Sequence, residues 1–358
     1  MPKELRNATV FFTRKCPYSC RCCKIHDDSH PIKELNTEQW IEVMRILKNN
    51  RIDFMLVQGN EPWLLGVDLL KIVKAKKIPY AMYASCHPSI FRPNYETLFS
   101  NGLDSLACGV DSYCVDWSNK WTHTQAKSHY ALEAFKLTRS KFPKVDCQAT
   151  CTISAFNAHE LIMLCNYICN TLDMVIAYNF IHADIDGQFD FFPSLDEMKR
   201  QGLMLTDKYK FDMVCRAMDD LFLRLHGRKD HKIFCLEDLL QIPMIFGKTG
   251  VTNDIWHCGG NPHGGPTVDA DGSLRLCAYR KGVEVPQMSI FDLTNKDKWE
   301  EWQRRMKVDA AKCPGCAWQC PRMYHFYKKN PELAKKVFVN HALTSTSEYK
   351  EGTHRKYE

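Results

Sequence analysis

The stretch that decides the fold is CPYSCRCC, residues 16–23, which follows a short apolar segment at 8–13. Within it, Cys16, Cys20 and Cys23 are spaced C-x3-C-x2-C. Cysteine thiolates are the usual ligands of iron–sulfur clusters, and three of them can hold a [4Fe–4S] cluster while leaving one iron open. An open iron can bind and activate a small molecule, whereas a cluster with four cysteine ligands usually only passes electrons. The spacing therefore favours a catalytic cluster.

Apolar segments rich in β-branched or aromatic residues recur along the first half of the chain and predict buried strands. They lie at 8–13, 53–59, 79–85, 105–111, 144–153 and 174–182. Helical patterns separate them, at 36–47 behind a capping pair of Asn36 and Gln39, and at 64–74, 95–100, 124–139 and 158–170. Alternating strands and helices imply parallel pairing with right-handed crossovers. In barrels of this kind the chemistry lies at the C-terminal ends of the strands.

In its cysteine spacing the chain resembles the radical S-adenosylmethionine (radical SAM) superfamily. The resemblance implies an α/β fold, a partial (β/α)6 TIM-like barrel with a small C-terminal cysteine-rich α+β module. It also implies a [4Fe–4S] cluster on Cys16, Cys20 and Cys23, whose open iron takes the amino and carboxylate groups of S-adenosylmethionine. The family commonly has an aromatic residue where this chain has Cys22, which we expect to pack rather than to act as a decoy ligand.

The end of the second predicted strand resembles the family's GGEP motif. It reads Gly59, Asn60, Glu61 and Pro62, with Asn60 in place of the second glycine. The resemblance implies that the backbone here and Glu61 receive the amino group of S-adenosylmethionine. The alternative is an ordinary turn between a strand and a helix, because Gly and Pro punctuate loops generally.

Other strand ends supply further candidates for binding S-adenosylmethionine. The fourth predicted strand ends in GVDS, similar to a family motif, so Asp111 and Ser112 are candidates to contact the methionine or ribose end. Ser85 after the third strand and Asn157 after the fifth occupy family-like positions. For Asn157 a helix N-cap ahead of Glu160 is a sufficient alternative explanation.

A second group of cysteines lies near the C-terminus. They are Cys258, Cys277, Cys313, Cys316 and Cys320, with a hairpin turn at 269–272 before Cys277. Their spacing resembles the SPASM/twitch extension of radical SAM proteins, which implies an auxiliary [4Fe–4S] cluster on the first four. Cys320 is then spare, or a bridging or alternative ligand. A structural zinc site is the alternative, because paired cysteine knuckles also form tetrahedral zinc sites.

Composition agrees with one barrel and one smaller module. The chain has 358 residues, of which 45% are hydrophobic, enough to bury a large core. We expect the barrel at 1–230, the auxiliary module at 231–330 and a polar extension at 331–358. The N-terminus lacks a signal-peptide pattern and no apolar run has membrane-spanning length. The expected location is therefore the cytoplasm, with most of the other ten of the 18 cysteines as small buried hydrophobes.

The net charge of +6 is spread over basic clusters that we interpret mainly as solvated surface, with nucleic-acid binding as the lesser reading. Three acidic residues just past the sixth strand, Asp184, Asp186 and Asp190, lie where a substrate should enter.

The resemblance implies a radical SAM enzyme that reductively cleaves S-adenosylmethionine to a 5′-deoxyadenosyl radical, which abstracts hydrogen from a substrate. Oxidation, rearrangement or another modification would follow, with flavodoxin or ferredoxin as the reductant. Small molecules, peptides and nucleosides are possible substrates. The alternatives are a RiPP-type peptide maturase, modification of a nucleoside or nucleic-acid base as in phage DNA hypermodification, and a non-catalytic iron–sulfur or zinc-binding protein. The chain ahead of Cys16 is too short for a leader-binding domain, which lowers the expectation of a peptide substrate.

Overall fold

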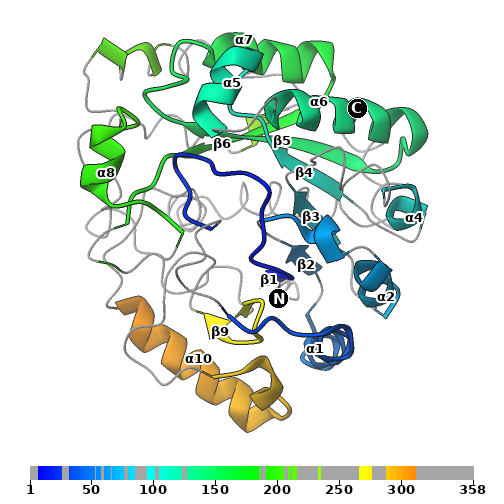
Figure 1. Ribbon diagram of the computed structural model, residues 1–358. Coiled ribbons are helices and arrows are strands. Elements are labelled where there is room, and N and C mark those ends of the chain that lie inside the picture. The colour runs from blue at the N-terminus through cyan, green and yellow to red at the C-terminus, as the bar shows by residue number, and fades with distance from the viewer. Residues whose placement is uncertain are drawn as a thin grey trace, which may run out of the picture.

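The computed structural model describes residues 7–25, 32–52, 54–57, 60–65, 67–75, 80–84, 95–100, 105–122, 127–184, 187, 191–204, 209–210, 212–214, 216, 233–234, 266–275 and 288–311. In this part of the chain the strands form one sheet, with helices packed along its outer side (Figure 1). None of the described helices is both long enough and apolar enough to cross a membrane.

All six predicted strands are present. They are β1 (Asn7–Val10), β2 (Phe54–Val57), β3 (Tyr80–Ala84), β4 (Ser105–Gly109), β5 (Asp146–Ile153) and β6 (Val175–Phe180). Each pairs in parallel with its neighbour along the chain. A short β7 (Ile233–Phe234), which the sequence did not predict, adds in parallel beside β6. The predicted α/β fold with a parallel, TIM-like sheet is confirmed.

The helices follow the predicted alternation, with differences at their ends. Those expected are α1 (Thr37–Asn49), η1 (Pro62–Leu65) with α2 (Val67–Ala75), α4 (Tyr95–Ser100), α6 (Lys127–Lys141) and α7 (Leu161–Asn166). The capping box of Asn36 and Gln39 is confirmed. The helix predicted at 158–170 begins only at Leu161 and ends in a π-helical turn, η2 (Tyr167–Thr171). Helices α5 (Val115–Thr122) and α8 (Leu195–Arg200) were not predicted.

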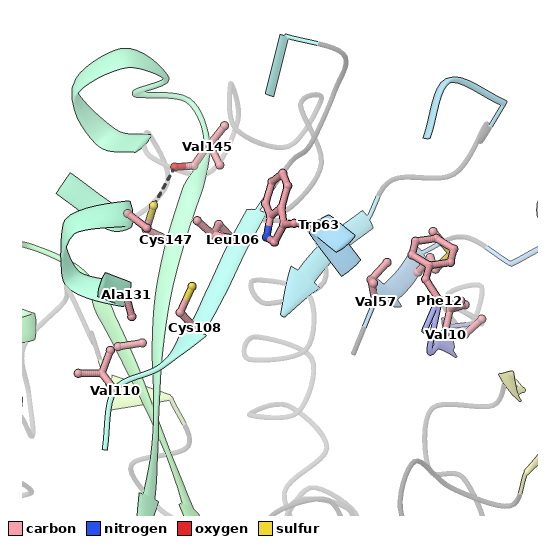
Figure 2. Packing of buried hydrophobic residues seen from close by; sticks show 14 of the residues in the cluster. Val10, Phe12, Val57, Trp63, Leu106, Cys108, Val110, Ala131, Val145 and Cys147 are labelled. Carbon is pink, nitrogen blue, oxygen red and sulfur yellow. Dashed lines mark hydrogen bonds between the residues drawn. The ribbon is translucent and has the colours of Figure 1, made fainter. Parts of the chain in front are cut away.

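One face of the sheet packs against the helices. Figure 2 shows Leu106 and Cys108 of β4 near Ala131 of α6 and Cys147 of β5. The Cys147 Sγ lies 3.9 Å from the Val145 carbonyl oxygen. Burial in this core confirms the prediction of small buried hydrophobes for five cysteines, Cys108, Cys147, Cys151, Cys165 and Cys169.

The opposite face of the strands carries polar side chains. Because side chains alternate along a strand, the residues between the core positions of β5 point the other way, and they are Gln148 and Thr150. Thr9 of β1 and Asn179 of β6 occupy equivalent positions. A polar face inside a parallel sheet suits a bound polar ligand better than a packed core.

The predicted hairpin at 269–272 is confirmed and joins the barrel sheet. Strands β8 (Thr267–Val268) and β9 (Leu274–Arg275) pair antiparallel, and β8 pairs in parallel with β1. Helix η4 (Ile290–Asp292) and helix α10 (Lys296–Ala311) follow. The described part of the predicted auxiliary module therefore extends the same sheet; the module's limits stay a prediction.

Gly272 makes the turn of this hairpin and is a sensitive position. Its φ is +83°, and an added Cβ would lie 3.2 Å from side-chain atoms of Leu35 and Phe291. We expect Gly272→Ala to lower the free energy of unfolding by about 1–2 kcal/mol from the left-handed backbone, and further because these side chains must move. Gly202→Ala is the matched control, since Gly202 has a φ of +67° but no atom within 4 Å of the added Cβ. Urea unfolding measures both variants. Equal losses in the free energy of unfolding would contradict a steric effect of Leu35 and Phe291.

Candidate cluster and cosubstrate site

The cysteine loop follows β1 at its C-terminal end and brings Cys16, Cys20 and Cys23 together. The Cys23 N–H donates to the Cys20 carbonyl at 2.9 Å. Burial, together with a smaller effect of the Cys20 thiolate charge, raises the pKa of Cys16 and of Cys23 to about 12. Three thiols that resist ionisation next to one another need a positive charge to deprotonate them, and iron supplies one. The donor set therefore fits a cluster held by three cysteines.

Among the described residues, no three His, Cys, Asp or Glu side chains are placed to hold a single metal ion. Cysteines that hold a [4Fe–4S] cluster each bind a different iron, so their sulfurs need not meet at one centre.

Cys22 has a packing role and is not one of the three candidate cluster ligands. Its side chain packs against the second hydrophobic cluster, formed by Ile181, Ala183, Met198, Leu203 and Met204. Burial is also the largest cause of a pKa well above the ordinary thiol value. The predicted packing role is confirmed.

The Asn60–Glu61 turn is tied to the backbone just before Cys16. Asn60 has a φ of +65°, the left-handed region that glycine and, among other residues, asparagine favour, which explains how it replaces a glycine here. The Asn60 side-chain amide donates to the Thr13 carbonyl, and the Glu61 N–H donates to the Lys15 carbonyl at 2.9 Å. Glu61 is fully buried, and Pro62 begins η1. The two motifs that the sequence connected are therefore neighbours in space.

Asp111 lies beyond β4, where its carboxylate meets a buried lysine. The Lys127 Nζ is 3.2 Å from Asp111 Oδ2, and the Thr152 N–H donates to Oδ1 at 2.8 Å. The positive charge of Lys127 also acts on Cys20, where it opposes the rise in pKa that burial causes. Burial would lower the pKa of Lys127, but the charges of Cys20 and Asp111 outweigh it, so the pKa lies well above its ordinary value.

Sequence reasoning missed Lys127. One signal was available: Lys127 is the first residue of α6, where the positive end of the helix dipole disfavours a cation. A lysine at such a position indicates an anionic partner elsewhere in the fold.

The side chain of Asn157 forms hydrogen bonds to other residues of the protein. Its side-chain amide donates to the carbonyls of Asp111 at 2.7 Å and Thr152 at 2.9 Å, and its Oδ1 accepts from the Ser154 N–H at 2.9 Å. The predicted N-cap explanation is wrong, because the residue at the N-cap of α7 is Glu160. Because a turn at 155–160 precedes the helix, Asn157 lies outside the helix, and its side chain connects the ends of β4 and β5.

Ser112 is also held by the fold. Its hydroxyl donates to the Glu160 carboxylate, which also accepts from the Tyr113 N–H at 3.2 Å. Both Ser112 and Glu160 are buried. This interaction orders the loop after β4 that carries Asp111.

The segment after β6 covers the cysteine loop. The Lys24 N–H donates to the Phe191 carbonyl at 2.9 Å, and the Lys24 ammonium lies 3.3 Å from Glu197. Buried His182 stacks on Phe192, and burial lowers the His182 pKa to about 4, so its ring is neutral near pH 7. Asp184, one of the three acidic residues expected at the substrate entrance, donates its N–H to Pro193.

The hairpin docks on the same loop through a shared carboxylate. Arg14 donates to both carboxylate oxygens of buried Asp269, and Arg275 donates to Oδ2 at 2.9 Å. Both guanidinium groups lie about 5 Å from the centre of the Phe191 ring, Arg14 at 5.2 Å and Arg275 at 5.1 Å. Residues next to Cys16 are thus fixed to the C-terminal part of the chain.

Several predicted site residues lie outside the described part of the chain. They are Gly59, Ser85, Asp186, Asp190, Cys258, Cys277, Cys313, Cys316 and Cys320.

The fold and the site together define a parallel α/β barrel with a three-cysteine loop at the C-terminal end of its strands. Residues 10–167 match the family model of the Radical SAM superfamily. This part of the chain is therefore similar to radical SAM domains. In sequence, the chain matches none of the curated proteins.

Solved structures share the fold at low identity. Streptococcus suis SuiB bound to S-adenosylmethionine aligns with a TM-score of 0.58 and 12% identity, over 84% of this chain and 65% of SuiB. Thus the chain spans just under two thirds of SuiB in that structure. Native anSMEcpe with bound AdoMet aligns with a TM-score of 0.55 and 14% identity, over 94% of this chain and 99% of that one.

Proposed function

We propose that this protein is a radical SAM enzyme whose cluster is held by Cys16, Cys20 and Cys23. The observation that carries the proposal is the joining of the cysteine loop to the Asn60–Glu61 turn by two hydrogen bonds. When bound, the cluster supplies the electron for reductive cleavage of S-adenosylmethionine, which yields a radical able to remove hydrogen from a substrate.

In this proposal the chain's own residues bind and orient the cosubstrate. The Asn60–Glu61 turn presents a buried carboxylate beside the cysteine loop, where an ammonium group would find a counter-charge. Asp111 is a further candidate contact, held in place by Lys127 and the Thr152 N–H. The segment after β6 covers the cysteine loop and would limit the access of water.

The test is release of 5′-deoxyadenosine. The anaerobically reconstituted, dithionite-reduced protein should release it from S-adenosylmethionine, even at a low uncoupled rate without substrate. Failure to release it, together with failure to bind S-adenosylmethionine, would favour the non-catalytic alternative.

Substitutions of Asn60 test the cosubstrate turn. Asn60→Gly keeps the left-handed backbone at no steric cost, so we expect binding of S-adenosylmethionine to change little. Asn60→Val loses the same hydrogen bond to Thr13 as Asn60→Gly does, but in addition it places a β-branched side chain at a φ of +65°, so we expect binding to weaken at least about tenfold, or roughly 1.4 kcal/mol. Equilibrium dialysis against labelled S-adenosylmethionine measures both. Equal affinity in the two variants would contradict this role of the turn.

We also propose an auxiliary [4Fe–4S] cluster on Cys258, Cys277, Cys313 and Cys316, with Cys320 as a spare or alternative ligand. Support comes from the spacing of the cysteines and from hairpin β8–β9, which ends two residues before Cys277. Iron analysis separates this from structural zinc: wild type should hold about eight irons, and Cys316→Ala about four.

For the substrate, a peptide has the best support. SuiB has been solved bound to its precursor peptide SuiA, and anSMEcpe with a Cp18Cys peptide. Modification of a peptide side chain is therefore the reaction class we propose to test first, by mass change of candidate peptides.

A further inference from the structure

A buried ion pair lies beside the candidate cluster site. The Lys127 and Asp111 side chains are only 13% and 6% exposed, and the Lys127 Nζ lies 3.2 Å from Asp111 Oδ2. The same ammonium lies close enough to Cys20 for its positive charge to favour the Cys20 thiolate, so the ion pair and the cysteine interact electrostatically. This is an unusual place for a lysine, because a buried charge needs compensation from its neighbours.

Gly109, the last residue of β4, leaves space for the Lys127 side chain. A Cβ added at Gly109 would lie 3.0 Å from the Lys127 Nζ and 3.9 Å from Asp111 Oδ2. Gly109 and Asp111 are two residues apart, so the extended backbone places them on the same face. Any larger residue at 109 would push the ammonium away from its partners. Glycine at position 109 thus leaves the space that the Lys127 ammonium occupies beside Asp111.

We propose that the Lys127–Asp111 pair sets the reduction potential of the cluster held by Cys16, Cys20 and Cys23. This inference rests on the proposed function. Reduction adds one negative charge to the cluster; a cation and its N–H donor beside a cysteine sulfur favour that charge, and a nearby carboxylate opposes it. Because both groups are buried, salt and water screen them little. The two residues therefore shift the reduction potential in opposite directions: Lys127 raises it and Asp111 lowers it.

The opposite signs give a sharp test. Reduction potentials are measured by EPR-monitored titration without S-adenosylmethionine, in a Cys313→Ala, Cys316→Ala background so that only one cluster is present. We expect Lys127→Met to lower the ratio of reduced to oxidised cluster at a fixed potential at least tenfold, equal to 59 mV or more for one electron. Asp111→Asn, which keeps an oxygen to accept from Thr152, should shift the potential upward. The double variant should lie between the two.

Matched variants separate charge from structure. Lys127→Arg keeps the charge and should stay closer to wild type than Lys127→Met. Lys136→Met, which removes an exposed lysine of the same helix, should leave the potential unchanged. If Lys127→Met fails to assemble a cluster, the potential of Asp111→Asn tests the proposal: an upward shift supports it and an unchanged or lower potential overturns it.

The outcomes also separate this inference from the proposed function. A wild-type protein that assembles no cluster on these cysteines overturns both. A normal cluster with unchanged potentials, or with shifts of the same sign in Lys127→Met and Asp111→Asn, overturns only the role of the ion pair.

Discussion

Cys20→Ala is expected to reduce 5′-deoxyadenosine release to the level measured without protein. Cys20 would supply one of three cluster ligands, and Cys16 and Cys23 alone cannot hold a [4Fe–4S] cluster firmly. The substitution also removes the thiol whose charge interacts with Lys127. Release is measured by chromatography of the anaerobic reaction, with the iron content of each preparation determined in parallel.

Cys22→Ala is the matched control for this prediction. Cys22 lies two residues away but packs against Met198 and its neighbours, so its loss should cost only about 1 kcal/mol of stability. We expect Cys22→Ala to keep its iron and most of its activity. Undiminished release in Cys20→Ala, or an equal loss in both variants, would contradict the ligand assignment.

Asp269→Ala is expected to have the largest effect on stability. Asp269 accepts hydrogen bonds from Arg14 and Arg275 and is buried, so its removal leaves two guanidinium groups without their shared carboxylate. Breaking a buried ion pair in this way costs about 3–5 kcal/mol. Asp271→Ala in the same turn is the control, because Asp271 accepts from the Ser273 N–H at a less buried position, worth about 1 kcal/mol. Urea unfolding of the reduced apoprotein compares them, and similar losses would refute the account.

The pH dependence of stability provides a second check on Asp269. Burial raises its pKa, but the hydrogen bond from Arg14 and the charge of Arg275 outweigh burial, so the pKa lies below its ordinary value. A lowered folded-state pKa contributes stability that is present above the unfolded pKa of about 4 and is lost as the pH falls through the folded pKa. Asp269→Asn should therefore flatten the loss of stability below about pH 4. An unchanged slope would contradict the ion pair.

Most of the barrel could be predicted because its signals are local. Each of the six strands is a short apolar run, and the capping box of α1 depends on two residues three apart. The addition of β8 to β1 could not be predicted, since two-residue strands carry no periodicity and more than 250 residues separate the partners. Helix α8 was missed although Ser194 caps it, because only two of its residues, Leu195 and Met198, are apolar and they show no repeated helical pattern.

In the candidate site, too, local motifs could be predicted from the sequence and contacts between distant residues could not. The cysteine loop and the Asn60–Glu61 turn are continuous motifs, and the structure places them side by side. Contacts between distant residues carry no local pattern, and these include Lys127 with Cys20 and Arg14 with Asp269. The role of Asn157 was misjudged because a polar residue ahead of a helix resembles an N-cap, whereas its amide joins two strand ends.

The central claim is that three cysteines of one loop hold a cluster with an iron open to S-adenosylmethionine. The most direct measurement is the EPR spectrum of the reduced Cys313→Ala, Cys316→Ala protein before and after S-adenosylmethionine is added. The account predicts a single cluster whose spectrum changes on addition of S-adenosylmethionine and is absent once Cys16, Cys20 and Cys23 are replaced by alanine. An unchanged spectrum with S-adenosylmethionine bound, or a cluster that survives the triple replacement, would contradict it.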